Sequence, residues 1–270
     1  MKFTDNKVAL DTTMTKVPEQ VVEQYLLEDV ELNSKGKCYP EDNPLSIGTI
    51  QMRYMTAADE DILTNQNFIQ KNTVLDKLLQ ALIVSDINID DLVLGDKDGL
   101  LLAARIFAYG KLYQPEIECP NCKRKTTLDV DLTQFNSKEI DFELLNRDNV
   151  YKFELPQCKK EIKFKLLTSG DDKQIEEEIK RSKKVGIPTN ETIIGLKHII
   201  ISIDGITEKQ SITKQLNTIL ATDIRSLRQY IQTINPGVDL NLDFECSDCG
   251  FESRISLPMK VQFFWPDARI

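Results

Sequence analysis

Two Cys-x-x-Cys pairs are the residues of this sequence whose types and spacing point most directly to chemistry. The pairs are Cys119 with Cys122 and Cys246 with Cys249. Two pairs with this spacing can supply four thiolates to one tetrahedral zinc ion. Four protein ligands leave no open position on the metal, so the pattern predicts a structural zinc site and not a catalytic one. Since the pairs lie far apart in the sequence, one shared zinc would join the two ends of a large insertion.

The segments that flank the two pairs resemble each other. Apolar and polar residues alternate through residues 115–118 and 126–132 around the first pair, and through 240–245 and 255–257 around the second. This alternation predicts half-buried strands that lead into and out of each metal-binding turn. Gly250 follows the second pair and can adopt the positive φ that a tight turn often requires. The alternatives are four reduced thiols or one redox pair of the thioredoxin type, but a redox motif would not occur twice with matching flanks.

Two further cysteines, Cys38 and Cys158, have no neighbour at metal-ligand spacing. Six cysteines in 270 residues are too few for a disulfide scaffold, and four of them fit metal spacing better. We therefore expect Cys38 and Cys158 to be free thiols. The same count indicates a reducing, cytosolic folding environment.

The sequence offers few residues for catalysis. His198 is the only histidine and lies among apolar residues, which favours a core or boundary position over a general base. The chain has neither the Gly-x-x-x-x-Gly-Lys loop of phosphate-binding proteins nor a Gly-x-Gly-x-x-Gly motif. We therefore predict that the protein is not an enzyme.

The overall charge argues against nucleic acid and anionic membranes as partners. The formal net charge is −9, whereas a phosphate backbone attracts basic surfaces. Residues 211–234 can be read as a helix-turn-helix with Arg225 and Arg228 on its second helix, but the connection lacks glycine and Asp223 stands at the start of that helix. Two helices packed within a domain are the favoured interpretation. No apolar stretch approaches the ~18 residues that cross a bilayer.

Hydrophobic patterning predicts an α+β protein with a helical N-terminal layer, a four-cysteine zinc ribbon made by two distant knuckles, and an inserted α+β subdomain. The five predicted segments are an extended arm (1–50), a helical region (51–116), the zinc ribbon (117–132 with 240–257), the inserted subdomain (133–239) and an aromatic C-terminal tail (258–270). The arm shows little hydrophobic periodicity, so we expect it to need a partner or the main body to become ordered.

Individual helices and strands follow from the same patterning. They are expected as helices after Thr56, over 74–83 and after Gly99, a hairpin with its turn at 156–160, a helix at 171–184, a buried strand or helix at 196–205, and two short helices at 212–220 and 224–234. The tail carries Phe263, Phe264 and Trp265. Aromatic side chains near a chain end either close the protein's own core, which is the favoured interpretation, or dock into a neighbouring subunit.

Several short motifs occur in a particular order along roughly residues 51–270. They are Thr56-Ala-Ala-Asp-Glu-Asp-Ile-Leu, the two cysteine knuckles, Ser202-Ile-Asp-Gly, Asn235-Pro-Gly-Val and Phe263-Phe-Trp-Pro. In order and spacing these motifs resemble the baseplate hub proteins of contractile-tailed bacteriophages of the T-even type. Members of that family are described both as hub subunits and as hub assembly proteins, so the resemblance leaves both roles open.

The resemblance implies a non-enzymatic subunit of a phage tail baseplate hub, located in the virion and assembled in the host cytoplasm. Its expected partners are other baseplate hub and tail proteins, and a homo-oligomer within a symmetric hub is compatible with this role. The expected cofactor is one structural zinc per chain. A hub assembly factor that is absent from the mature particle is the second interpretation. A zinc-ribbon protein that binds nucleic acid is the third.

Overall fold

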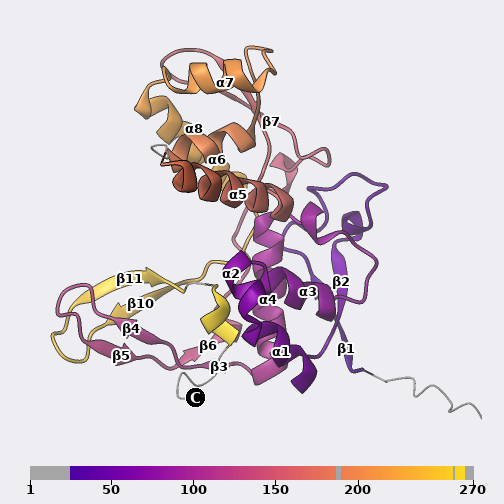
Figure 1. Ribbon diagram of the computed structural model, residues 1–270, viewed down its shortest axis with the longest axis vertical. Helices are drawn as coiled ribbons and strands as arrows, with labels where there is room; N and C mark the ends of the chain where they lie inside the picture. Colours follow the sequence, from indigo (N-terminus) through magenta and orange to yellow (C-terminus); the bar gives the residue numbers. More distant parts are fainter. Residues whose placement is uncertain (1–24, 187–189, 258, 265–270) are drawn as a thin grey trace, which may run out of the picture.

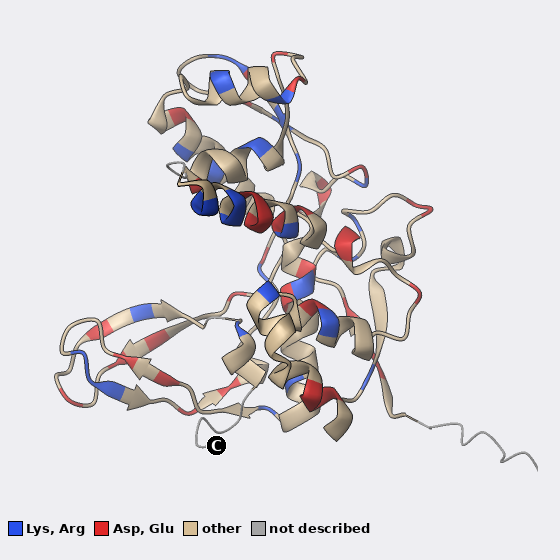
Figure 2. Ribbon diagram, in the orientation of Figure 1, with Lys and Arg blue, Asp and Glu red and all other residues tan. Residues whose placement is uncertain are grey.

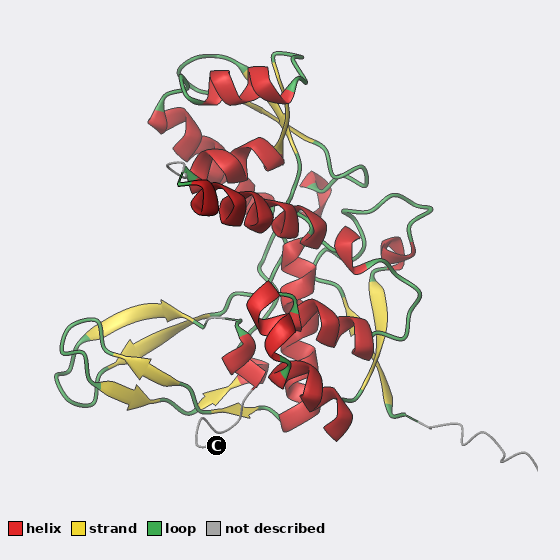
Figure 3. Cartoon of the chain, viewed as in Figure 1, coloured by secondary structure: helices red, strands yellow, loops and turns green. Residues whose placement is uncertain are grey.

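The chain folds into three parts, which Figure 1 separates clearly: a helical body, an α+β lobe and a ribbon of two hairpins that projects from the body. The computed structural model describes residues 25–186, 190–257 and 259–264. Helices dominate the body and the lobe, whereas the ribbon consists of strands and loops (Figure 3). This mixture of helices and strands confirms the predicted α+β class.

Four helices form the body. They are α1 (Ala57–Thr64), α2 (Gln66–Lys71), α3 (Val74–Leu82) and α4 (Leu94–Tyr109). Helix α1 begins directly after Thr56, as predicted, and the Thr56 amide and hydroxyl both donate to the Asp59 carboxylate at 2.8 Å. The bond from the Thr56 amide is the half of a capping box in which the third helical residue accepts from the residue before the helix. Helix α3 confirms the second predicted helix and turns its apolar stripe into the core.

Residues 25–50 belong to the body, so the prediction of an extended arm is wrong for this part of the chain. Strand β1 (Leu27–Glu31) pairs antiparallel with β2 (Thr49–Arg53), and the 3-10 helix η1 (Pro44–Ile47) lies in the loop between them. Leu32 and Leu45 in this loop are buried in the main core. Residues 1–24 of the predicted arm lie outside the described residues.

The loop between β1 and β2 is held by a buried carboxylate on helix α4. Asp96 accepts hydrogen bonds from the hydroxyls of Ser34 and Tyr39, both at 2.6 Å. The Tyr39 hydroxyl in turn accepts from the amide of Val93 at 3.0 Å. Contacts of this kind have no hydrophobic period, which is why the sequence pattern did not reveal that the loop is ordered.

Helix α4 begins earlier than the sequence predicts. It starts at Leu94 and not after Gly99, so Gly99 lies inside the helix. A Cβ at Gly99 would lie 2.5 Å from the Asn33 side chain, and one at Gly95 would lie 1.6 Å from the carbonyl oxygen of Pro236. Gly95 therefore needs to be glycine because the backbone of another segment approaches it closely, whereas a Cβ at Gly99 would displace the end of the Asn33 side chain. Gly95 is thus explained by a tertiary contact, and Gly99 does not mark a helix boundary.

The lobe combines a three-stranded antiparallel sheet with four helices. Its strands lie in the order β7 (Tyr151–Glu154), β8 (Glu161–Phe164) and β9 (Ile200–Ile203). Its helices are α5 (Ser169–Val185), α6 (Glu191–Ile199), α7 (Lys209–Leu216) and α8 (Ala221–Ile234). The predicted hairpin and the three predicted helices are confirmed. Residues 196–205, expected as a strand or a helix, contain the end of α6 followed by β9.

Short elements connect the three parts. They are β3 (Leu112–Tyr113), β6 (Val130–Asp131) and the 3-10 helices η2 (Ile89–Asp91), η3 (Leu132–Gln134) and η4 (Phe142–Leu144). Strands β3 and β6 pair where the ribbon leaves the body. Within the described ranges, no helix has both the length and the apolar character needed to span a bilayer.

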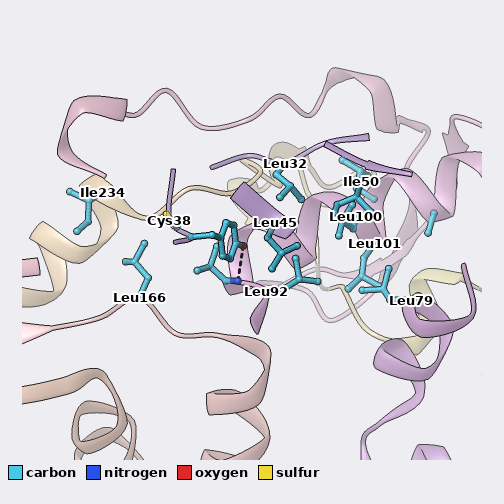
Figure 4. Close-up of a cluster of buried hydrophobic side chains, with 14 of the residues drawn as sticks. Leu32, Cys38, Leu45, Ile50, Leu79, Leu92, Leu100, Leu101, Leu166 and Ile234 are labelled. Atoms are coloured by element: carbon cyan, nitrogen blue, oxygen red, sulfur yellow. Dashed lines mark hydrogen bonds between the residues drawn. The ribbon is translucent and has the colours of Figure 1, made fainter. Parts of the chain in front are cut away.

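One hydrophobic core runs through the body and into the lobe. Figure 4 shows part of this core, in which Leu32 and Leu45 lie near Leu100 of α4, and Leu166 and Ile234 of the lobe occupy the other end. All five side chains are almost fully removed from solvent. Burial of apolar surface therefore holds the lobe against the body.

The end of the described chain packs into this core. The 3-10 helix η5 (Val261–Phe264) carries Phe263 and Phe264, and each side chain is buried. The Phe263 ring lies 5.1 Å from the Tyr113 ring in an edge-on arrangement. The core-closing interpretation is therefore confirmed for these two residues. Residue 258, Trp265 and residues 266–270 of the predicted tail lie outside the described residues.

Candidate metal centre

Two hairpins make up the ribbon. Strand β4 (Glu116–Glu118) pairs with β5 (Lys125–Thr127), and β10 (Asn241–Glu245) pairs with β11 (Glu252–Ser256), in both cases antiparallel. Each Cys-x-x-Cys pair lies in the turn between the two strands of its hairpin. The strands around the cysteines are therefore confirmed. Both turns lie at the end of the ribbon that is distant from the body (Figure 1).

The two cysteine turns are closed by equivalent main-chain hydrogen bonds. In each turn the first cysteine donates its amide to a carbonyl oxygen beyond the second cysteine and accepts an amide from the residue that follows the second cysteine. The four bonds are Cys119 N to Arg124 O (2.8 Å), Lys123 N to Cys119 O (3.0 Å), Cys246 N to Phe251 O (3.0 Å) and Gly250 N to Cys246 O (2.9 Å). The matching flanks in the sequence thus correspond to matching backbone geometry.

In both turns the residue after the second cysteine has a left-handed backbone. Gly250 has a φ of 65°, as its sequence position suggested, and Lys123 has a φ of 61°. Glycine adopts this conformation freely, whereas a residue with a Cβ is strained by about 1 kcal/mol. Lysine gives no signal of a left-handed backbone in the sequence. The strain at Lys123 becomes evident when the two turns are compared, because Lys123 and Gly250 each follow the second cysteine of their turn.

The four cysteine sulfurs come together between the hairpins. All four lie within 4.8 Å of one another, and two short separations join the two hairpins, at 3.8 Å for Cys119 to Cys249 and 3.6 Å for Cys122 to Cys246. Sulfurs placed about 2.3 Å from a tetrahedral zinc ion are about 3.8 Å apart. The residues therefore fit a zinc ion. Among the described residues, no other group of histidine, cysteine and carboxylate side chains converges in this way.

The surroundings of the cluster shift the pKa values of two of its cysteines in opposite directions. The amides of Asp248 and Cys249 point at the Cys246 sulfur and lower the pKa of Cys246 to about 6. At Cys122 the amide of Arg124 acts in the same sense, but desolvation and the neighbouring sulfurs outweigh it and raise the pKa of Cys122 to about 12. Four adjacent thiolates repel one another, which opposes deprotonation of all four cysteines. A divalent metal ion that binds the sulfurs offsets this repulsion.

The cluster has a small core of its own. Cys119 and Cys246 are buried, Cys122 is half-buried and Cys249 is exposed. The two buried cysteines pack with Phe244 in a cluster that is separate from the main core. So few buried side chains cannot stabilise an independent unit, and a small domain of this kind usually depends on its metal.

Polar side chains within the two turns also connect the hairpins. Arg124 pairs with Asp248 at 2.6 Å, and the Asn121 amide lies 3.7 Å from the Cys249 sulfur as a donor. None of Asn121, Arg124 and Asp248 is a ligand position in a recognised motif. Their only signal is their position inside or directly beside the Cys-x-x-Cys turns. The ion pair is exposed, so its contribution to stability is small.

The other residues singled out from the sequence lie away from this cluster. Cys38 and Cys158 are free thiols, and burial raises the pKa of Cys38 to about 12. His198 lies on α6 with its Nε2 atom 3.1 Å from the Glu178 carboxylate, as expected for a histidine at the boundary of the core. None of these three side chains joins the four-cysteine group.

Comparison with protein families gives a match over most of the chain. The family described as "T4 bacteriophage base plate protein" matches residues 22–265, a range that contains both hairpins, the lobe and the body. No curated protein and no solved structure matches the chain.

Proposed function

Because the chain belongs to the T4 bacteriophage base plate protein family, we propose that it is a structural subunit of the baseplate hub. Membership of the family places the protein in the tail baseplate of a virion. The proposed role there is to bind other hub and tail proteins during assembly, without catalysing a reaction. A symmetric hub would contain several copies of the chain.

The observation that carries this proposal is the extent of the family match. It includes the body, the inserted lobe and both cysteine turns, so the whole described architecture goes with the baseplate family and not one isolated motif. A projecting ribbon and a separate lobe also give the chain several surfaces for protein contacts (Figure 1). An acidic chain with a single histidine, which is engaged by Glu178, is compatible with a structural role.

We further propose that Cys119, Cys122, Cys246 and Cys249 hold one structural zinc ion per chain. Each of the two short sulfur separations joins different hairpins, so a bound zinc would tie together the two ends of the inserted lobe. Four cysteine ligands complete the tetrahedron and leave no position for a substrate. The role of the ion is therefore to stabilise the ribbon that projects from the body.

A nucleic-acid-binding ribbon is less well supported. The basic residues of the first turn are each close to an acidic side chain, at 3.9 Å for Lys123 to Glu118 and 2.5 Å for Lys125 to Glu116. Arg124 is likewise paired with Asp248. Binding to phosphates would first have to break these pairs, and the negative net charge opposes it further.

Quantitative mass spectrometry of purified phage particles tests the hub proposal. A hub subunit is expected at a fixed copy number relative to the other baseplate proteins. If the chain is required for assembly but missing from finished particles, the hub subunit proposal is wrong and the assembly factor takes its place. A copy number that varies between preparations would also argue against a hub subunit, which must be present in a fixed ratio.

A further inference from the structure

The lobe carries an apolar groove between helices α6, α7 and α8. The groove has a volume of about 310 Å³, and its apolar lining includes Ile193, Leu216, Ile219 and Ile224. Leu220, next to this lining, is 53% exposed and extends the apolar surface at the start of α8. A groove with this apolar lining has room for an apolar side chain of a partner.

Two arginines lie at the groove, on the first turns of α8. Arg225 and Arg228 both line it and are exposed. Among the described residues, neither takes part in an ion pair. The nearby Asp223 carboxylate is occupied elsewhere, since it accepts the amides of Gln157 and Cys158 at 2.8 and 3.1 Å. The groove thus combines apolar lining with two available positive charges in a protein of net charge −9.

The chemistry of the groove calls for an apolar segment that carries carboxylates. The chain contains such a segment in residues 17–24, Val-Pro-Glu-Gln-Val-Val-Glu-Gln, directly before the first described residue. Its acidic residues are Glu19 and Glu23, and its apolar residues include Val21 and Val22. The charges of this segment are complementary to Arg225 and Arg228, and its valines match the aliphatic lining of the groove.

The position of β1 decides which copy can supply this segment. Eight extended residues reach at most about 30 Å. Strand β1, where the described chain begins, and helices α7 and α8 lie at opposite ends of the long axis of the molecule (Figure 1). A neighbouring copy whose groove lies beside β1 is therefore the better acceptor. Figure 2 shows both blue and red residues along α5, and blue residues also on α7 and α8.

We propose that the groove formed by α6, α7 and α8 binds residues 17–24 of a second copy of this chain. The contact links neighbouring copies head to tail, which is the arrangement that generates a ring when the rotation closes. The inference rests on the proposed role of the chain as an assembling subunit and names the partner of one of its surfaces.

A fluorescent peptide of residues 1–24 tests the groove directly. It is titrated into the full-length protein, and its anisotropy is measured. Saturable binding is expected, and the double variant Arg225→Ala/Arg228→Ala should weaken it roughly tenfold because two charge contacts are lost. The matched control, Arg181→Ala/Arg254→Ala, removes the same charge at exposed sites outside the groove and should bind as the unchanged protein does.

A second version of the peptide tests the same charge contacts without any change to the protein, so the result does not depend on whether the arginine variant folds. The peptide with Glu19→Gln and Glu23→Gln should bind the unchanged protein roughly tenfold more weakly. No binding of the original peptide, or equal binding to both double variants, would overturn the proposal. So would binding of a labelled single-stranded oligonucleotide that disappears in the Arg225→Ala/Arg228→Ala variant, since the groove would then serve nucleic acid. Particle mass spectrometry tests the hub role separately, because a hub subunit can be present while this groove binds something else.

Discussion

The guanidinium of Arg105 on helix α4 donates a hydrogen bond from Nε to the main-chain oxygen of Phe263 at 2.9 Å. Arg105 is 2% exposed, and its guanidinium also lies over the rings of Tyr109 and Tyr113. This one side chain therefore connects the central helix of the body with the last described segment. The aromatic end of the chain is held in the core by a polar contact as well as by apolar burial.

Replacement of Arg105 should destabilise the whole body. In Arg105→Ala the Phe263 oxygen loses its donor, and the two tyrosine rings lose the group that they pack against. We expect the free energy of unfolding to fall by about 2–4 kcal/mol. Thermal unfolding measures the change, with Arg181→Ala on the exposed face of α5 as the control. A melting temperature equal to that of the control would show that the contact with Phe263 contributes nothing.

Loss of one cysteine ligand should affect the ribbon more than the body. Elemental analysis is expected to find one zinc per chain, and Cys246→Ser should remove it, because binding energies of ~10–16 kcal/mol depend on the complete ligand set. The ribbon has its own small core, so its amides should lose protection from hydrogen exchange while those of α3 and α4 keep it.

Cys158→Ser is the matched control for this experiment, since Cys158 is a free thiol in the lobe. It should retain both the zinc and the protection of the ribbon. A folded, fully reduced protein that contains no metal would refute the zinc proposal. A Cys246→Ser variant with normal exchange in the ribbon would refute the structural role of the site.

The two left-handed residues of the metal turns should respond oppositely to substitution. Gly250→Ala introduces a Cβ at a φ of 65° where no atom lies within 4 Å, so its cost is backbone strain alone, about 1 kcal/mol. Lys123→Gly relieves the same strain in the other turn and should leave stability unchanged or slightly higher. Competition with a zinc chelator measures both effects. Equal losses of zinc affinity in the two variants would contradict this assignment of strain.

Asp98 should make stability depend on pH in the acidic range. Desolvation raises its pKa from 3.8 to about 6, and the nearby Lys97 and Lys138 offset this only in part. The folded state therefore binds more protons than the unfolded state between about pH 4 and pH 6, and the contribution of Asp98 to stability falls as the pH rises through this window.

Asp98→Asn should remove this dependence and raise the free energy of unfolding at pH 7 by roughly 1–3 kcal/mol. Denaturant unfolding at several pH values between 4 and 7 measures it. Asp86→Asn removes the same charge from an exposed site and is the control. An Asp98→Asn variant whose stability changes with pH as steeply as that of the control would disprove the assignment.

The sequence alone determined the local elements of this protein and the chemistry of its metal ligands. The strands around Cys119 and Cys246 were predictable because a period of two residues appears directly in the order of apolar side chains. Helices α3 and α8 were predictable for the same reason, with the helical period. The spacing within each cysteine pair is also a local property, so the ligand set could be named before the sulfurs were seen together.

Only the tertiary structure decided how these pieces meet. The order of residues 25–50 depends on Asp96, which lies far along the chain from Ser34 and Tyr39. The need for glycine at position 95 of α4 comes from the backbone near Pro236, and the position of Phe263 in the core is stabilised by Arg105. Contacts between distant segments produce no periodic pattern in the sequence. The residue type that such a contact requires depends on the segment packed against it, and not on the residues next to it along the chain.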